Sequence, residues 1–258
     1  MIKIFETHAH YDDEAFDLDR EELIASFKEN NIVKVVNIGA SIETSKRTVE
    51  FTKKYDFFYG AVGVHPSEIR ELESIDGINI LRRLATENEK IVAIGEIGLD
   101  YHYEDTDKPL QKKWFEKQMD LARELSLPIV VHSRDAAKDT VDIMKANKAE
   151  ELGGVVHCYS YTKELARDFL DMDYFFGIGG VVTFKNAKKL KEAVEYIPLD
   201  KLVLETDCPY LAPEPYRGKR NSSLYIPYAA EAIAEIKKIT VEELYDVTYN
   251  NAMKLYKL

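Results

Sequence analysis

The chain has 258 residues, of which 45% are hydrophobic and 31% charged, as is typical of a soluble globular protein with a large core. Its formal net charge of −11 counts against broad electrostatic binding of duplex nucleic acid, although it says little about a local site. No stretch approaches the roughly 18 uncharged apolar residues of a membrane span, so the sequence predicts none.

The cysteine content and the N-terminal residues favour a cytoplasmic protein. Cys158 and Cys208 are the only two cysteines, too few for a disulfide framework. The segment MIKIFETHAHYDD has no basic region followed by a small-residue cleavage site, so we expect no signal peptide. Both thiols are expected to be small buried groups.

Short apolar and β-branched segments alternate with helical patterns along the whole chain. Continuous apolar runs of this kind are typical of parallel strands that are buried on both faces. The expected strands span residues 2–7, 33–39, 57–64, 91–97, 128–133, 154–158, 174–179 and 201–206. The expected helices span residues 20–30, 43–55, 76–89, 109–126, 135–147, 162–171, 186–195, 225–238 and 241–256. Asp19 with Glu22, and Thr240 with Glu243, predict caps for the first and last helices.

Eight strand–helix units without a long flexible linker favour the α/β class and a single (β/α)8 barrel of the TIM type. We expect this barrel to form one domain over residues 1–258. The alternative is an open doubly wound sheet, which is weakened because no G-x-G-x-x-G motif follows the first strand. In a barrel the carboxyl ends of the strands converge on one rim, where active sites lie.

Histidines and carboxylates stand at or near the ends of these expected strands. His8 and His10 are two residues apart on an extended segment, so their side chains point the same way and can reach one metal ion. Glu96 lies in an otherwise apolar strand, where a lone carboxylate is costly unless it is paired or bound to a metal. The other candidates are His132, His157 and Asp207, which end the fifth, sixth and eighth strands.

These six residues predict two divalent cations, roughly 3.5–4 Å apart, with Glu96 as the bridging carboxylate. One ion is expected to bind His8, His10, Asp207 and Glu96, and the other Glu96, His132 and His157. Imidazole-rich ligation suits Zn, Mn, Ni or Co, whereas Mg prefers oxygen ligands. The sequence therefore leaves open whether the working ion is Mg, Mn or Zn.

Further polar residues near the expected rim are candidates for substrate contact. His65 follows the third strand, and we expect it to contact the substrate, with a structural role as the alternative. The segment LAPEPYRGKRNSS after the eighth strand is locally basic, and such loops often hold phosphate in this fold. The candidate phosphate contacts are Arg134, Arg217, Lys219 and Arg220.

As a set, these motifs resemble those of the TatD-like metal-dependent deoxyribonucleases, within the wider amidohydrolase-type barrels. The resemblance covers essentially the whole chain. It rests on THAH at 7–10, GVHP at 63–66, GEIGLDY at 95–101, PIVVHSRDA at 128–136, GVVHCYS at 154–160, ETDCPYLAP at 205–213 and RGKRN at 217–221.

The resemblance implies the same six metal ligands and a metal-dependent nuclease of the 3′–5′ exonuclease or abasic-site type. Its expected substrate is DNA, with single strands or 3′ ends favoured, and no obligate protein partner or membrane is expected. One departure is visible, because Ser222 and Ser223 follow RGKRN where the family usually has Glu-Pro. This departure is expected to affect the geometry of the phosphate-contacting loop and not the metal ligands.

The expected chemistry is phosphodiester hydrolysis by a water molecule that two metal ions activate. Asp207 is placed to accept the proton of this water. Glu205 is the second candidate catalytic carboxylate, as a group that orients the site, a further metal ligand or a buried structural residue. The main alternative is hydrolysis of a small ester, amide or lactone on the same barrel. A non-catalytic binding protein is less favoured, because no metal ligand is missing.

Overall fold

The computed structural model describes residues 2–74 and 76–258. These residues form two compact units, each with its own strands and helices. Unit 1 comprises residues 1–37, 158–167 and 175–258, and unit 2 comprises residues 38–157 and 168–174. The expectation of one domain over residues 1–258 stays a prediction.

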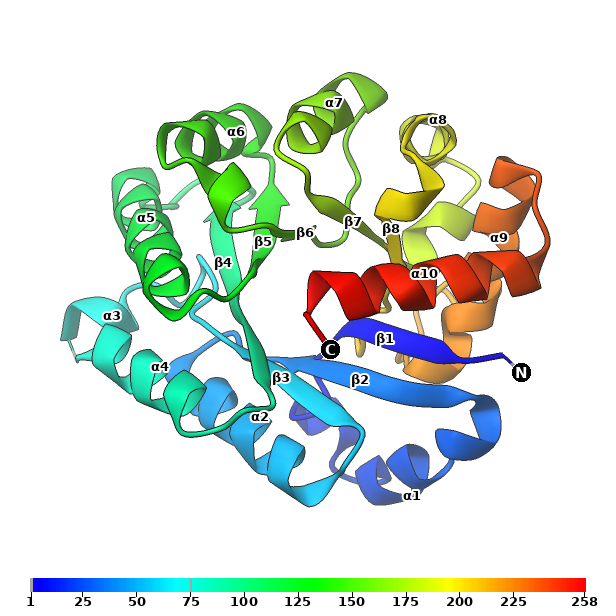
Figure 1. The fold of residues 1–258 in the computed structure, drawn as a ribbon, viewed down its shortest axis with the longest axis horizontal. Coiled ribbons are helices and arrows are strands. Elements are labelled where there is room, and N and C mark those ends of the chain that lie inside the picture. The colour runs from blue at the N-terminus through cyan, green and yellow to red at the C-terminus, as the bar shows by residue number, and fades with distance from the viewer. Residues whose placement is uncertain (1, 75) are drawn as a thin grey trace. The chain divides into compact units, whose positions relative to one another are not determined.

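Eight strands alternate with helices along the described part of the chain, as the sequence predicted (Figure 1). Unit 1 contains β1 (Ile4–Ala9), most of β2 (Ile32–Ile38), β7 (Phe175–Ile178) and β8 (Leu202–Leu204). Unit 2 contains β3 (Phe58–Val62), β4 (Ile91–Asp100), β5 (Ile129–Arg134) and β6 (Gly154–Val156). Pairing is parallel between β1 and β2, between β7 and β8, and along the series β3, β4, β5 and β6.

The helices of unit 1 are α1 (Arg20–Ala25), α8 (Lys188–Tyr196), α9 (Ile226–Lys237) and α10 (Val241–Leu255). Those of unit 2 are α2 (Ile42–Lys54), α3 (Glu71–Ser74), α4 (Gly77–Thr86), α5 (Lys108–Leu125) and α6 (Ala137–Ala146). Helix α7 (Lys163–Asp171) has residues in both units. Over residues 2–74 and 76–258, none of the helices has the length and apolar composition that crossing a membrane requires.

Strand β4 is longer than predicted. The apolar pattern placed its end at residue 97, but the strand continues to Asp100. The reason is its register with β5, in which Gly98 pairs with His132 and Asp100 with Arg134. Asp100 therefore lies on the sheet and not in a loop.

The predicted cap of the first helix is wrong, whereas that of the last helix is confirmed. Asp19 precedes α1, but its side chain makes no capping hydrogen bond. Both of its carboxylate oxygens instead accept N–H groups of Arg220 at 2.6 Å, and this pair lowers the pKa of Asp19. Such a charge-assisted, two-point contact is stronger than a bond to a neutral backbone amide. Thr240 does cap α10, because its hydroxyl accepts the backbone N–H of Glu243 at 3.1 Å.

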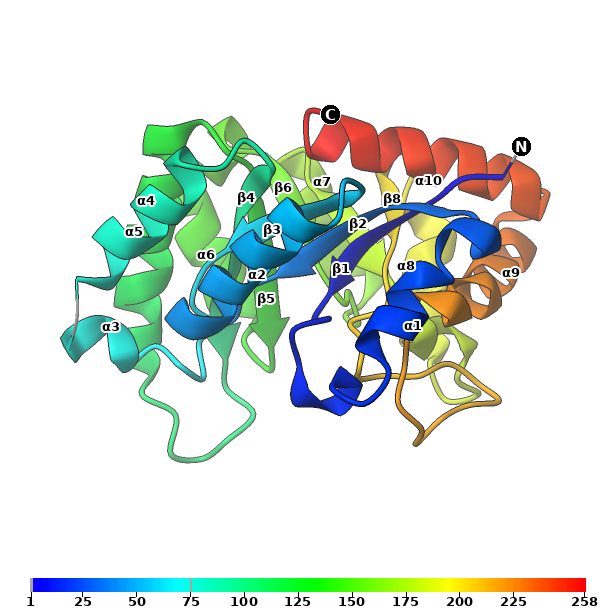
Figure 2. The same cartoon turned by 90° about the horizontal axis from the view of Figure 1, so that it is seen from below.

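Helix α10 packs against β1 and β8 of unit 1 (Figure 2). The Tyr256 hydroxyl donates to the Thr7 carbonyl at 2.8 Å, and the Asn251 side chain donates to the Leu202 carbonyl at 2.7 Å. Beyond these contacts, Ala9 and Cys208 form a parallel bridge. The helix thus fixes the two strands whose ends carry candidate metal ligands.

Glu6 is a buried carboxylate that joins β1 to the segment after β8. Its Oε1 accepts the backbone N–H groups of His8 at 3.1 Å and Thr206 at 2.9 Å. Its Oε2 accepts the hydroxyl groups of Thr206 at 2.6 Å and Ser223 at 2.8 Å. Burial raises the pKa of Glu6 to about 7, although these four hydrogen bonds act in the opposite direction.

We expect Glu6 to make the metal-stripped protein less stable as the pH rises from about 4.5 to about 7. The carboxyl pKa is about 7 when folded and 4.5 in the unperturbed side chain, so the folded state holds the proton more tightly. The contribution of the Glu6 carboxyl group to the free energy of unfolding is fully present below pH 4.5 and is lost as the pH rises through 7. It amounts to about 3 kcal/mol, from about 1.4 kcal/mol per pKa unit.

The Glu6→Gln variant provides the matched comparison. The amide oxygen of the variant side chain keeps the hydrogen bonds from the two backbone N–H groups. The hydroxyls of Thr206 and Ser223 can rotate to accept hydrogen bonds from the amide nitrogen. In urea unfolding at pH 5, 6 and 7, the wild-type protein should lose stability relative to this variant as the pH rises. Parallel stability curves for the two proteins would show that Glu6 is not the titrating group.

Candidate metal centre

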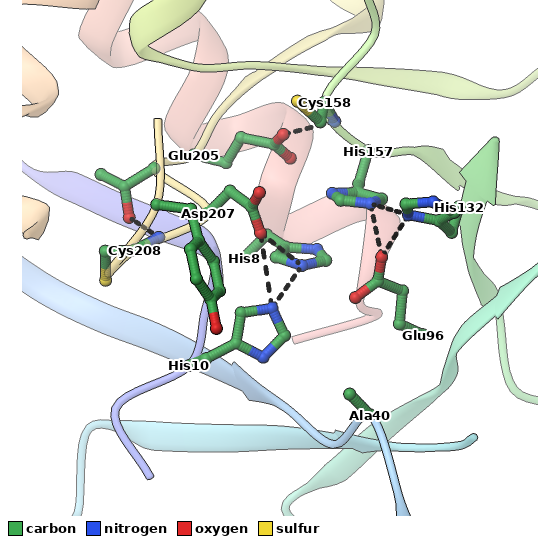
Figure 3. Close-up of polar contacts among 12 residues, drawn as sticks. His8, His10, Ala40, Glu96, His132, His157, Cys158, Glu205, Asp207 and Cys208 are labelled. Carbon is green, nitrogen blue, oxygen red and sulfur yellow. Dashed lines mark hydrogen bonds and ion pairs between the residues drawn. The ribbon is translucent and has the colours of Figure 1, made fainter. Parts of the chain in front are cut away.

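Unit 1 brings together three of the predicted metal ligands, His8, His10 and Asp207 (Figure 3). The Nε2 atoms of the two imidazoles lie 3.2 Å apart. The Asp207 Oδ1 atom lies 3.5 Å from Nε2 of His8 and 3.4 Å from Nε2 of His10. The backbone sets this geometry, because the Asp207 N–H donates to the His8 carbonyl and the His10 N–H to the Cys208 carbonyl, both at 2.9 Å.

This donor set fits a divalent cation. Ligand atoms placed tetrahedrally at about 2.1 Å from a zinc-sized ion are about 3.4 Å from one another. The three separations in this group, 3.2, 3.4 and 3.5 Å, match that spacing. Two imidazoles with one carboxylate suit Zn or Mn.

Unit 2 brings together Glu96, His132 and His157, which come from β4, from β5 and from the residue after β6 (Figure 3). The Glu96 Oε1 atom lies 2.7 Å from Nδ1 of His132 and 2.6 Å from Nε2 of His157. These two ring nitrogens are 3.1 Å apart. Burial acts to raise the pKa of Glu96, but the imidazoles around it hold this pKa well below its usual range. Glu96 is therefore an anion that is ready to bind a cation.

Asp100 is a candidate site residue that the sequence analysis did not predict. Its Oδ2 lies 3.3 Å from Nε2 of His132, on the far side of the ring from Glu96. Once Nδ1 has lost its proton, a proton held on Nε2 by Asp100 leaves the lone pair of Nδ1 available to a metal ion. The signal was present in the sequence, since Glu96 and Asp100 are four positions apart on one strand and so share a face.

His132 also belongs to a second group of possible ligands. His65, Asp100 and His132 have atoms close enough to hold one ion, which would use Nε2 of His132. The contacts of Nδ1 at 2.7 and 3.1 Å are shorter than the 3.3 Å contact of Nε2. We therefore favour Nδ1 as the ligand atom, with Asp100 as the group that orients the ring.

His65 is a neutral hydrogen-bond donor beside Glu96. Burial lowers its pKa to about 3. Its Nδ1 accepts the backbone N–H of Ser67 at 3.0 Å, which assigns the remaining ring proton to Nε2. This Nε2 lies 3.8 Å from Glu96 Oε1. The expected role of His65 in substrate contact stays a prediction.

Glu205 is buried in unit 1, where a hydrogen bond and close packing against a glycine hold its carboxylate. Its Oε1 accepts the backbone N–H of Cys158 at 2.5 Å. It lies against Gly177, where an added Cβ would come within 1.9 Å of Oε2, so only glycine leaves room for it. Of the two cysteines, Cys208 is buried and Cys158 is half-buried. A catalytic role for Glu205 stays a prediction.

The four candidate phosphate contacts have exposed side chains with different local environments. Arg220 is held by Asp19 and also donates to the Ala15 carbonyl at 2.9 Å. All four cations lie over aromatic rings, at 4.8 Å for Arg220 over Phe16, 4.4 Å for Arg217 over Phe184, 5.7 Å for Lys219 over Tyr216 and 6.0 Å for Arg134 over Tyr103. Contacts of these cations with a substrate stay predictions.

Ser223, one of the two residues that depart from the family pattern, is buried. Its hydroxyl donates to Glu6 at 2.8 Å and accepts from the Tyr11 hydroxyl at 2.7 Å. Its backbone N–H donates to the Tyr11 oxygen at 2.9 Å. Ser223 thus takes part in the hydrogen bonds that hold β1, and the expected effect of the departure on the phosphate-contacting loop stays a prediction.

Parallel strands whose ends carry groups of imidazoles and carboxylates define the class as an α/β metal-dependent hydrolase. The chain belongs to the TatD family, since the family model described as TatD related DNase matches residues 5–257.

Relatives in two bacteria match nearly the whole chain. An uncharacterized metal-dependent hydrolase of Bacillus subtilis, YabD, is 44% identical over 255 residues, or 99% of each chain. An uncharacterized metal-dependent hydrolase of Escherichia coli K12, YcfH, is 35% identical over 258 residues, covering 99% of this chain and 96% of YcfH. The crystal structure of YjjV, a TatD homologue from Escherichia coli, matches with a TM-score of 0.92 at 26% identity, covering 99% and 98% of the two chains. This match confirms the predicted (β/α)8 barrel.

We expect metal binding in unit 2 to compete with a proton on His132. Burial lowers the pKa of this ring, but its contacts with Asp100 and Glu96 raise the pKa to about 9. The ring is therefore protonated at neutral pH in the metal-stripped protein, and Nδ1 must lose its proton to bind an ion. The apparent affinity should rise up to about tenfold per pH unit below pH 9.

Two measurements test this coupling. An NMR titration of the histidine ring signals in the metal-stripped protein should show a pKa near 9 for His132 and a lower pKa in Asp100→Asn. Zn²⁺ added at pH 8 should release more protons from the wild-type protein than from this variant. Equal release from both proteins would contradict the role of Asp100. The exposed Asp200→Asn substitution is the control and should leave both results unchanged.

Proposed function

We propose that this metal-dependent hydrolase is a deoxyribonuclease that shortens single-stranded DNA from its 3′ end. The convergence of His8, His10 and Asp207 in a triangle with sides of 3.2–3.5 Å carries the proposal, because it fits a hydrolytic metal ion. The description of the matching family model, TatD related DNase, supports DNA as the substrate.

The proposal includes two divalent cations, which are Mg, Mn or Zn. His8, His10 and Asp207 would hold one ion, and Glu96, His132 and His157 would hold the other. A bound divalent cation lowers the pKa of water from about 16 towards 7 and withdraws negative charge from phosphoryl oxygens.

The protein's own groups supply the proton transfers and the orientation. An Asp207 carboxylate oxygen accepts the proton of the attacking water, and the P–O3′ bond breaks as the new P–O bond forms. The proton then passes to the leaving 3′ oxygen, so the products are a shortened strand and a nucleotide with a 5′-phosphate. The Nε2–H group of neutral His65 donates a hydrogen bond to an anionic oxygen of the substrate, while Arg217 and Lys219 contact phosphates farther along the strand.

The test restores Mg²⁺, Mn²⁺ or Zn²⁺ in turn to metal-stripped protein with single-stranded DNA labelled at the 3′ or the 5′ end. We expect stepwise shortening from the 3′ end with at least one ion. Asp207→Asn should lower kcat by at least about 10²–10⁴-fold, the usual contribution of a positioned proton acceptor. The exposed Asp200→Asn variant should retain wild-type activity.

Three other outcomes would contradict the proposal. If metal-loaded protein cleaves no DNA but hydrolyses a small ester, amide or lactone, the alternative substrate class on the same barrel replaces it. If Asp207→Asn cleaves DNA at the wild-type rate, the carboxylate is not the proton acceptor. Internal cleavage without shortening from the 3′ end would assign an endonuclease instead.

A further inference from the structure

Tyr210 is an exposed aromatic residue close to the candidate metal ligands of unit 1. Its side chain is 55% exposed, and that of the next residue, Leu211, is 40% exposed. The Tyr210 ring lies 6.5 Å from the His10 ring between centroids, at an interplanar angle of 63°. Single exposed apolar residues are ordinary on protein surfaces. Tyr210 differs from such residues because it lies beside predicted metal ligands and because hydrogen bonds hold its side chain in place.

Hydrogen bonds fix Tyr210 at its backbone and at the end of its ring. Its N–H donates to the Asp207 carbonyl at 2.9 Å, and its own carbonyl accepts the Asn221 side chain at 2.7 Å. Its hydroxyl donates to Asp13 Oδ2 at 3.0 Å. Asp13 is itself fixed, since its Oδ1 accepts the Ala15 N–H at 2.8 Å. The face of the ring is thus presented in one orientation.

Contacts with Gly180 and Thr183 hold the backbone segment that carries Tyr210 and Leu211. Gly180 packs so closely against this segment that an added Cβ would lie 2.4 Å from the Leu211 carbonyl oxygen. The Glu214 N–H donates to the Thr183 hydroxyl at 2.9 Å. Leu211 is held at a φ of 55°, a left-handed conformation that non-glycine residues rarely adopt. The fold therefore maintains an unfavourable backbone that exposes two apolar side chains.

We propose that Tyr210, with Leu211 beside it, forms a stacking site for the nucleobase at the 3′ end of a single DNA strand. This inference rests on the proposed function. A tyrosine face stacks on any base, so it suits an exonuclease that must accept every nucleotide in turn. The Asp13 carboxylate at the hydroxyl end of the ring disfavours a phosphate there, whereas a base is neutral. Because the Tyr210 ring lies 6.5 Å from the His10 ring, a base stacked on it would lie close to the predicted metal ligands of unit 1.

Binding can be measured without catalysis. Oligonucleotides with 2-aminopurine as the 3′-terminal base should lose fluorescence on stacking when they bind metal-stripped protein in EDTA. Tyr210→Leu should abolish the quenching, whereas Tyr210→Phe should keep it, because the ring and not the hydroxyl stacks. Tyr196 provides a matched control, since it is 48% exposed and ends α8, and Tyr196→Leu should quench like the wild type.

Activity supplies the second measurement. Wild-type protein should cleave a strand that ends in a normal nucleotide about 5- to 150-fold more efficiently, in kcat/KM, than one that ends in an abasic tetrahydrofuran nucleotide. This range corresponds to a stacking free energy of about 1–3 kcal/mol. The ratio should fall close to one in Tyr210→Leu and stay at the wild-type value in Tyr196→Leu.

The two proposals fail in different ways. Equal cleavage of both strands by the wild-type protein, or an unchanged ratio in Tyr210→Leu, overturns the stacking site and leaves the nuclease function standing. Failure of the wild-type protein to cleave either strand with any ion overturns the nuclease function, and the stacking site with it.

Discussion

The parallel register of neighbouring strands is the constraint on which both candidate metal-binding groups depend. In unit 2 the register pairs Val131 with Val156, so the next residues, His132 and His157, lie side by side although 25 residues separate them. In unit 1 the bridge between Ala9 and Cys208 does the same for residues about 200 positions apart. A slip of one residue in either register would turn a ligand to the opposite face of its strand.

Two buried carboxylates show how the surroundings assign different roles to the same chemical group. Glu6 accepts hydrogen bonds from neutral donors, and its burial raises its pKa to about 7. Glu96 is also buried, but imidazoles surround it and hold its pKa well below the usual range. Glu6 is therefore suited to anchoring backbone segments, because either protonation state can be accommodated. Glu96 stays an anion, as a metal ligand must.

The sequence predicted those features that local patterns determine. Apolar runs located all eight strands, and the polar residues at their ends identified both groups of imidazoles and carboxylates. Asp100 was missed because the apolar run stops at residue 97, while pairing with β5 extends the strand. The predicted helix cap at Asp19 was wrong because Arg220, 201 residues away, forms hydrogen bonds with the Asp19 carboxylate. Such competition between distant partners leaves no local pattern.

The charge of the protein limits how it can hold a polyanion. With a net charge of −11, long-range attraction to DNA is absent, so affinity must come from local contacts. In the basic loop Arg220 is already paired with Asp19, and each further phosphate contact by Arg217 or Lys219 weakens with salt. Bound cations would neutralise part of the repulsion near the ligands. Stacking on Tyr210 would add affinity that needs no charge, which is the kind of contact that an acidic protein would need in order to bind a polyanion.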